Sequence, residues 1–168
     1  MTMNHAGLRT AVRKVAHDFF DRHPAADHGT KWNGGPGRRR HGTDGIRGEA
    51  LAGLPSVFDT GLPAYAAARR AGCDPALASY ALLGVLMQRV EDTTAISRCG
   101  PDGLARLKRD GAELARLVAS AADPVPFLEI LNDEYRRRRL TMGGVADCMA
   151  VVFAFHQLGA DPSTGGAI

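Results

Sequence analysis

Two adjacent carboxylates, Glu91 and Asp92, end a run of apolar residues that has helical spacing. Glu91 follows Met87 by four residues, so it continues the helical stripe formed by Leu77, Tyr80, Ala81, Gly84 and Met87. An ionised carboxylate on such a face is costly unless a cation, a metal ion or a hydrogen-bond donor compensates it. The acidic pair is therefore either part of a binding or catalytic site or a helix end that reaches water, as in many structural ion pairs.

A further acid, Asp147, follows the glycine pair Gly143 and Gly144 near the start of a predicted helix. Helical spacing places it on one stripe with Ala150, Val151, Ala154 and Leu158, which predicts that Asp147 faces the core. The free N–H groups and the positive dipole end of the first turn could bind a phosphate, or Asp147 could simply cap them. Both interpretations stay open at this point.

Residues 41–63 form a glycine-rich segment, HGTDGIRGEALAGLPSVFDTGLP, that contains Arg47 and Glu49. Glycine lets the main chain approach a ligand, and a guanidinium matches phosphate oxygens, although such a loop could also only turn a corner. The three segments together supply acids for magnesium, arginines for phosphate and glycines for access, as a nucleoside triphosphate requires. No Walker motif or kinase glycine loop is present, which excludes the familiar triphosphate-binding folds.

Three segments, in the order in which they occur, resemble the triphosphoribosyl-dephospho-CoA synthase family: GTDGIRGEALAGLPSVFDTGLPAY, GVLMQRVEDTTAISRCGPDGL and LTMGGVADCMAVVF. The resemblance covers about residues 41–158 and depends on the combination of GIRGEA, VEDT followed by R-x-G, and GG-x-AD. It implies an all-α enzyme that makes the prosthetic-group precursor of citrate lyase or malonate decarboxylase from ATP and 3′-dephospho-CoA. Adenine is released in that reaction.

In the implied reaction, the 2′-hydroxyl of dephospho-CoA attacks the anomeric carbon of the ATP ribose while positive charge builds on the sugar. The family motifs and the charge pattern together predict Glu91 and Asp92 as the catalytic acids, and Asp92 and Asp147 as ligands of Mg²⁺. The predicted substrate and phosphate site comprises Arg47, Glu49, Arg98, Gly143 and Gly144.

The chain departs from the family pattern in two respects. It lacks the family's N-terminal segments of the P-K-P-G-L-V and H-x-D-M types, and Thr94, Cys99, Met142 and Val145 replace the usual Asn, Gly, Pro and Ser. Missing N-terminal helices would leave apolar surface uncovered, at a cost of roughly 25 cal/mol per Å². We therefore expect a homodimer or a second chain that supplies the missing half. A truncated, non-catalytic nucleotide-binding or partner subunit of the same fold remains the alternative.

Composition indicates an ordinary soluble protein, with 168 residues, 45% hydrophobic and 23% charged. The net charge of +3 and the arginine runs at residues 38–40 and 136–139 could attract polyanions. Aromatic residues make up only 6%, and zinc-finger spacing is missing, so a small phosphorylated ligand fits this composition as well as nucleic acid does, and composition alone does not choose between them. With weak stacking and groove-reading signals, nucleic acid is not the expected partner. Three cysteines without C-x-x-C spacing predict reduced thiols, and no apolar run is long enough to cross a bilayer. We therefore expect a cytoplasmic protein.

Helical periodicity predicts about six helices, over residues 7–21, 59–72, 75–92, 101–120, 125–139 and 145–159. Residues 23–48 show no period and are predicted to form a long irregular Gly/Arg-rich connection. No segment alternates with a period of two, so the expected fold class is an all-α helical bundle that forms a single domain over residues 1–168.

Overall fold

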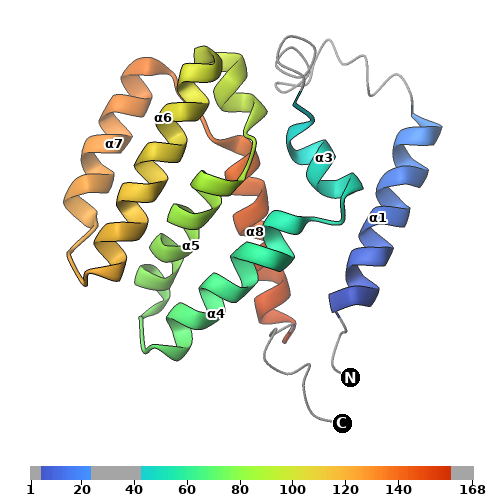
Figure 1. Cartoon of the computed structure of the whole chain (residues 1–168), viewed down its shortest axis with the longest axis horizontal. Coiled ribbons are helices and arrows are strands. Elements are labelled where there is room, and N and C mark those ends of the chain that lie inside the picture. The colour runs from blue at the N-terminus through green and yellow to red at the C-terminus, as the bar shows by residue number, and fades with distance from the viewer. Residues whose placement is uncertain (1–4, 24–42, 160–168) are drawn as a thin grey trace.

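The computed structural model describes residues 5–23 and 43–159. Within these ranges the chain forms seven α-helices and one π-helix and no β-strand, which confirms the predicted all-α fold class. The elements are α1 (His5–Arg22), α3 (Gly45–Leu51), η2 (Ser56–Gly61), α4 (Leu62–Arg70), α5 (Pro75–Arg89), α6 (Thr93–Ala119), α7 (Val125–Arg138) and α8 (Gly143–Gln157). Helices α4 to α8 form one body, and α1 and α3 lie along one side of it (Figure 1).

Local signals in the sequence explain where several helices begin. Asp74 caps α5 by accepting a hydrogen bond of 2.8 Å from the Leu77 amide, and Pro75 occupies the first helical position. Helix α6 is broken at Gly100, whose φ of 69° and ψ of −171° are not helical, and it restarts at Pro101. The predicted start at Pro101 is confirmed, but the helical turns over residues 93–99 were not predicted.

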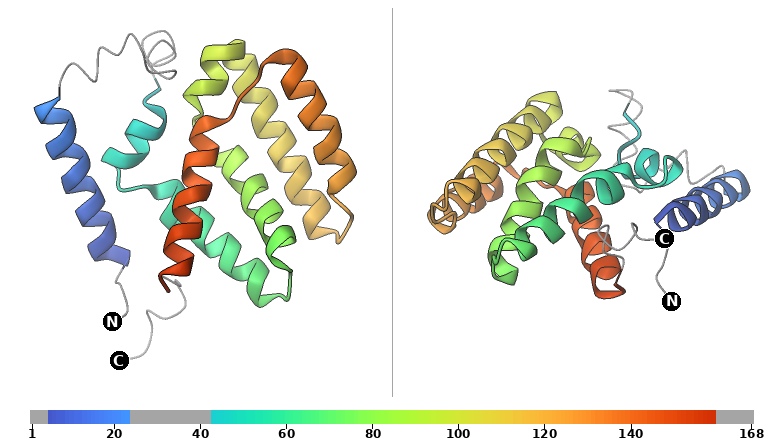
Figure 2. Two further views of the ribbon diagram at one scale, coloured as in Figure 1. Left: turned by 180° about the vertical axis from the view of Figure 1, so that it is seen from behind. Right: turned by 60° about the horizontal axis from the view of Figure 1, so that its bottom comes forward.

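The centre of the molecule is the seam between α5 and α6, where the two backbones come into contact. A Cβ atom on Gly111 would lie 2.5 Å from the Met87 Cβ and 2.9 Å from the Gly84 carbonyl oxygen, so these positions accept only glycine without a shift. Leu82, Leu86, Leu107 and Leu114 are completely buried around this seam. Helix α8 lies behind it and contributes Val145, Cys148 and Val152 to the same core (Figure 2).

Helix α7 lies at the far end of the molecule from α1 and is joined to α6 by a polar network (Figure 1). The buried Asp110 accepts hydrogen bonds from the Tyr135 hydroxyl at 2.8 Å and from the Arg106 Nε at 2.7 Å, and Arg106 also contacts Glu134 at 2.6 Å. Burial, followed by the bond to Asp110, raises the pKa of Tyr135. The network compensates an acid that would otherwise be buried at a high cost.

Two of the predicted boundaries are wrong. The irregular connection was placed over residues 23–48, but α3 already begins at Gly45, and residues 24–42 lie outside the described part of the chain. Helix α5 was expected to reach about Asp92 but ends at Arg89, since Val90 has extended backbone angles.

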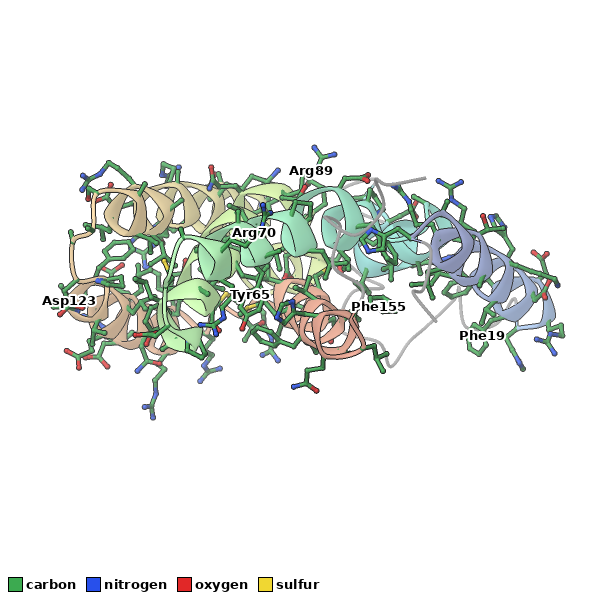
Figure 3. All side chains as sticks on the ribbon, turned by 90° about the horizontal axis from the view of Figure 1, so that it is seen from below. Phe19, Tyr65, Arg70, Arg89, Asp123 and Phe155 are labelled. Atoms are coloured by element: carbon green, nitrogen blue, oxygen red, sulfur yellow. The ribbon has the colours of Figure 1, made fainter. Side chains whose placement is uncertain are left out.

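Helix α1 is present as predicted, but its apolar side is only partly covered. Of its residues only Ala16 is buried, while 66% of Val15 and 40% of Phe19 are exposed. Phe19 lies on α1 at the end of the molecule remote from Asp123 and α7 (Figure 3). No helix in the described ranges combines the length and the apolar character needed to span a membrane.

The predicted buried stripe of α8 is also wrong. The buried residues of α8 are Gly144, Val145, Cys148 and Val152, whereas Asp147, Ala150, Ala154 and Leu158 are exposed. Val151 is half-buried. Helix α8 is apolar on both faces, so spacing alone could not decide which face lies against the core.

Candidate functional site

Asp92 links the starts of two helices that are far apart in the sequence. Its side chain is completely buried. Its Oδ1 accepts hydrogen bonds from the Thr94 amide at 2.9 Å, the Thr94 hydroxyl at 2.6 Å and the Ala95 amide at 3.1 Å, all in the first turn of α6. Its Oδ2 accepts a bond of 3.0 Å from the Val145 amide in the first turn of α8. Asp92 is therefore compensated by four donors and by the positive ends of two helix dipoles.

The glycine pair lies against this carboxylate. The Gly143 amide donates to the Thr94 hydroxyl oxygen at 2.8 Å, and a Cβ on Gly144 would come within 3.3 Å of the Asp92 Oδ2. Glycine thus allows the start of α8 to approach Asp92, and the amides of Gly143 and Val145 are used inside the protein. The phosphate-binding role of Gly143 and Gly144 stays a prediction. Thr94, which directly follows VEDT, joins the two motifs; in the sequence it stood out only as a departure from the family pattern, and this contact was not predicted.

Asp92 and the starts of α6 and α8 form one junction, and the GIRGEA segment lies against it from a third side. Gly45 is buried with a φ of +53°, and a Cβ there would lie 2.6 Å from the Thr93 Cγ2. Glu49 accepts hydrogen bonds from the Ser56 amide at 2.9 Å and the Ser56 hydroxyl at 2.6 Å. It therefore closes the turn between α3 and η2, and the three motifs converge around the start of α6.

Arg47 lies on the side of α3 that faces α1. It is half-buried, and its guanidinium carbon lies 4.3 Å from the centre of the Phe20 ring, within the range of a cation–π contact. This arginine helps to hold α1 against α3. Its predicted contact with phosphate is untested by this geometry and stays a prediction.

Glu91 and Arg98 do not join the junction. Glu91 was expected on the buried stripe of α5, but that helix ends before it, and its side chain is exposed and paired with Lys108. Arg98 is also exposed, and it forms no ion pair with any residue in the described ranges. The expected burial of Glu91 is therefore wrong, while the catalytic role of Glu91 and the phosphate contact of Arg98 stay predictions.

Asp147 lies about one turn beyond Gly143 in α8, with its side chain directed to the surface. Partial burial and the nearby charge of Asp92 raise its pKa. Burial together with the charges of Glu49, Asp147 and Asp92 raises the pKa of the Cys148 thiol to about 12. Each of the three motifs therefore places one acid close enough to raise the pKa of the same buried thiol. In the sequence, only the family motifs could indicate that these acids lie together.

The acids near the junction differ in their capacity to bind a cation. No group of three or more His, Cys, Asp or Glu side chains in residues 5–23 and 43–159 is arranged to hold a metal ion. Both oxygens of Asp92 and both oxygens of Glu49 already accept hydrogen bonds. Asp147 accepts none from the described residues. The predicted roles of Asp92 as a catalytic acid and of Asp92 and Asp147 as Mg²⁺ ligands stay predictions.

Comparison with known proteins adds a family to this geometry. The family model described as ATP:dephospho-CoA triphosphoribosyl transferase matches residues 2–164. The chain belongs to this family. The match confirms the resemblance drawn from the three motifs and extends it to α1, which had not been included. No solved structure matches the chain significantly.

Curated relatives within the family are about a third identical to the chain over the segments that align. A probable 2-(5″-triphosphoribosyl)-3′-dephosphocoenzyme-A synthase of Azotobacter vinelandii is 36% identical over 78% of this chain and 44% of its own length. The probable synthase of Pectobacterium carotovorum is 32% identical over 92% of this chain and 50% of its own length. The synthase of Pectobacterium atrosepticum is 38% identical over 70% of this chain and 38% of its own length. The chain thus spans half or less of the length of these relatives.

Proposed function

We propose that the chain acts in the synthesis of 2′-(5″-triphosphoribosyl)-3′-dephospho-CoA from ATP and 3′-dephospho-CoA. The bond between the ribose anomeric carbon and adenine breaks, and a bond to the 2′-oxygen of dephospho-CoA forms. The hydroxyl proton passes to a base, and adenine leaves. The product is the precursor of the prosthetic group of citrate lyase or malonate decarboxylase.

The observation that carries this proposal is the convergence of the three family motifs at one junction. GIRGEA reaches it through Gly45, which lies against Thr93 of VEDT. VEDT contributes Asp92, and GG-x-AD contributes the Val145 amide that donates to it. Residues that come together from three distant segments are expected where a family shares one site, and Asp147, which accepts no hydrogen bond from the described residues, has no such structural role there.

The acids have different proposed roles. Asp92 holds the starts of α6 and α8 in place, and Asp147 is the proposed ligand of Mg²⁺, with Asp92 behind it. When bound, Mg²⁺ would neutralise charge on the triphosphate. Glu91, which is exposed in the loop before α6, is the proposed acceptor of the hydroxyl proton. Arg47 and Arg98 are the proposed phosphate contacts.

The proposal includes a partner. On α1, 66% of Val15 and 40% of Phe19 are exposed. We propose that a second copy or a second polypeptide covers this apolar surface and completes the site.

The three cysteines are unpaired, which fits a cytoplasmic location.

The test is the release of adenine. The purified chain, alone and mixed with any polypeptide that carries the remaining half of the family fold, is incubated with ATP, 3′-dephospho-CoA and Mg²⁺, and free adenine is quantified by chromatography. Release that requires both substrates supports the proposal. Failure to release adenine in every combination, together with calorimetric binding of ATP, would instead support a non-catalytic nucleotide-binding subunit.

A further inference from the structure

A cavity of about 600 Å³ lies between α5, α7 and the start of α8. Most of its wall is aliphatic, formed by Leu83, Met87, Leu128, Leu131 and Met142. Arg136 and Arg139 add two positive charges to this apolar wall, and Asn132 adds an amide. A cavity with this composition suits a ligand that is mostly uncharged and carries an anionic group at one end.

The two arginines are not used within the described structure. Arg106 and Arg116 each bind carboxylates, but Arg136 and Arg139 form no ion pair with any residue in the described ranges, and both are exposed. Their charges favour the C-terminal end of α7 through the helix dipole, as do those of Arg137 and Arg138. The helix dipole does not explain why two of these four arginines, Arg136 and Arg139, line a cavity.

The cavity borders the junction of the family motifs. Its lining includes Gly143 and Ala146, the first and fourth residues of GG-x-AD. Ala146 immediately precedes Asp147. The Gly143 amide in turn donates to Thr94 beside Asp92. A ligand in the cavity would therefore lie directly against the first turn of α8, and Asp92 lies on the other side of that turn.

We infer that this cavity binds the pantetheine arm of 3′-dephospho-CoA, with its diphosphate held by Arg136 and Arg139. The inference depends on the proposed function for its choice of ligand. The arm is a long, uncharged chain of methylene, methyl and amide groups, which fits the aliphatic wall and Asn132. Guanidinium groups match the diphosphate. An adenine ring fits less well, because Tyr135 is the one aromatic lining residue within the described part of the chain, and it is buried with its hydroxyl bonded to Asp110.

Direct binding of 4′-phosphopantetheine and of 3′-dephospho-CoA, measured by calorimetry on the full chain, tests this inference. We expect the double variant Arg136→Ala, Arg139→Gly to bind both probes about tenfold or more weakly. Arg139 has a φ of +54°, which glycine adopts without strain, so the loss of binding is expected without a loss of stability. The matched control is Arg137→Ala, Arg138→Ala, which removes the same charge outside the cavity lining.

A second variant, Ala146→Leu, fills the cavity without changing any charge. Ala146 is exposed on α8, so the fold should tolerate leucine there, and binding of both probes should weaken. Three results would overturn the inference: unchanged affinity in Ala146→Leu, an equal loss in the control double variant, or 4′-phosphopantetheine binding no more tightly than inorganic diphosphate.

These outcomes are separable from those of the proposed function. If the chain releases adenine but the cavity variants leave the KM for 3′-dephospho-CoA unchanged, the inference fails and the proposed function stands. If the probes bind and the variants abolish binding while no adenine is ever released, the cavity assignment stands and the proposed activity fails.

Discussion

Asp92 is the residue on which the junction of motifs depends. It is buried without a cationic partner among the described residues, and four donors from α6 and α8 compensate its charge. Removing the acceptor would leave buried amides at the starts of two helices without hydrogen bonds. Such losses are among the more costly single changes in a protein.

Replacing Asp92 with Asn should lower the free energy of unfolding by about 3 kcal/mol, because an NH₂ group would then face the Val145 or Thr94 donors. Urea denaturation followed by circular dichroism measures this effect. The control is Glu91→Gln, which breaks only the exposed pair with Lys108 and should cost less than about 1 kcal/mol. Equal midpoints for Asp92→Asn and the wild type would show that the four hydrogen bonds contribute nothing.

Cys148 provides a second test at the level of single residues. Its thiol is buried, and its pKa is raised to about 12, so at pH 8 only about 10⁻⁴ of the thiol is ionised. Native protein treated with iodoacetamide at pH 8 should be modified at the half-buried Cys73 and Cys99 and not at Cys148, as judged by peptide mass spectrometry. All three should react in urea. Rapid labelling of Cys148 in the native state would contradict the packing of α8.

The sequence predicted that a buried acid exists near residue 92 but not how it is compensated. A buried carboxylate is recognisable from its apolar neighbours, whereas its partner Val145 is 53 residues away and donates through a backbone amide that any residue would have. Glu91 illustrates the converse error, since α5 ends three residues earlier than expected and Glu91 is exposed instead of buried.

At the level of elements, the seam between α5 and α6 determines the core. The change Gly111→Ala should lower the free energy of unfolding by about 1–3 kcal/mol, because the new methyl group would overlap the Met87 Cβ. The matched control is Gly7→Ala in α1, where nothing lies within 4 Å of the new Cβ and helix propensity should stabilise the protein by up to about 1 kcal/mol. Thermal denaturation of both variants measures the difference, and the same sign of change in both would refute the close packing at Gly111.

The success of the element predictions follows the strength of the local signals. Asp74 with Pro75, Pro101 and Pro124 mark helix starts that the structure confirms to within a residue. Helix α3 was missed because its seven residues contain two glycines, and tertiary contact with Thr93 and with α1 stabilises it more than propensity does. The buried face of α8 was missed because the exposed alanines look as apolar as the core residues.

For the whole molecule, α1 is a helix with little buried surface, since Ala16 is its one buried residue. It is held through Arg9, which contacts Asp59 at 2.5 and 3.0 Å, and through Arg13, whose Nε donates to the Ala52 carbonyl at 2.9 Å. These contacts are largely exposed, and an exposed ion pair contributes at most about 1 kcal/mol. Helix α1 should therefore open more readily than the α5 and α6 core.

Hydrogen exchange followed by mass spectrometry tests this difference. Amides of α1 should exchange well before those of α5 and α6, and Asp59→Asn should accelerate exchange in α1 without changing the global unfolding midpoint. The control, Asp18→Asn, removes only the pair with Lys14 inside α1 and should have a smaller effect. Equal protection of α1 and α6 would mean that α1 is part of the cooperative core.

The hydrogen bond from the Val145 amide to Asp92 also offers a spectroscopic reporter of the junction. An amide proton bonded to a carboxylate is strongly deshielded, so its resonance should stand apart at low field in a nitrogen-15 correlation spectrum. Its position would respond whenever the distance between the two helix starts changes by a few tenths of an ångström. Titrations of nucleotide, 3′-dephospho-CoA or divalent ion could thus be followed at one peak, before any assay of turnover is established.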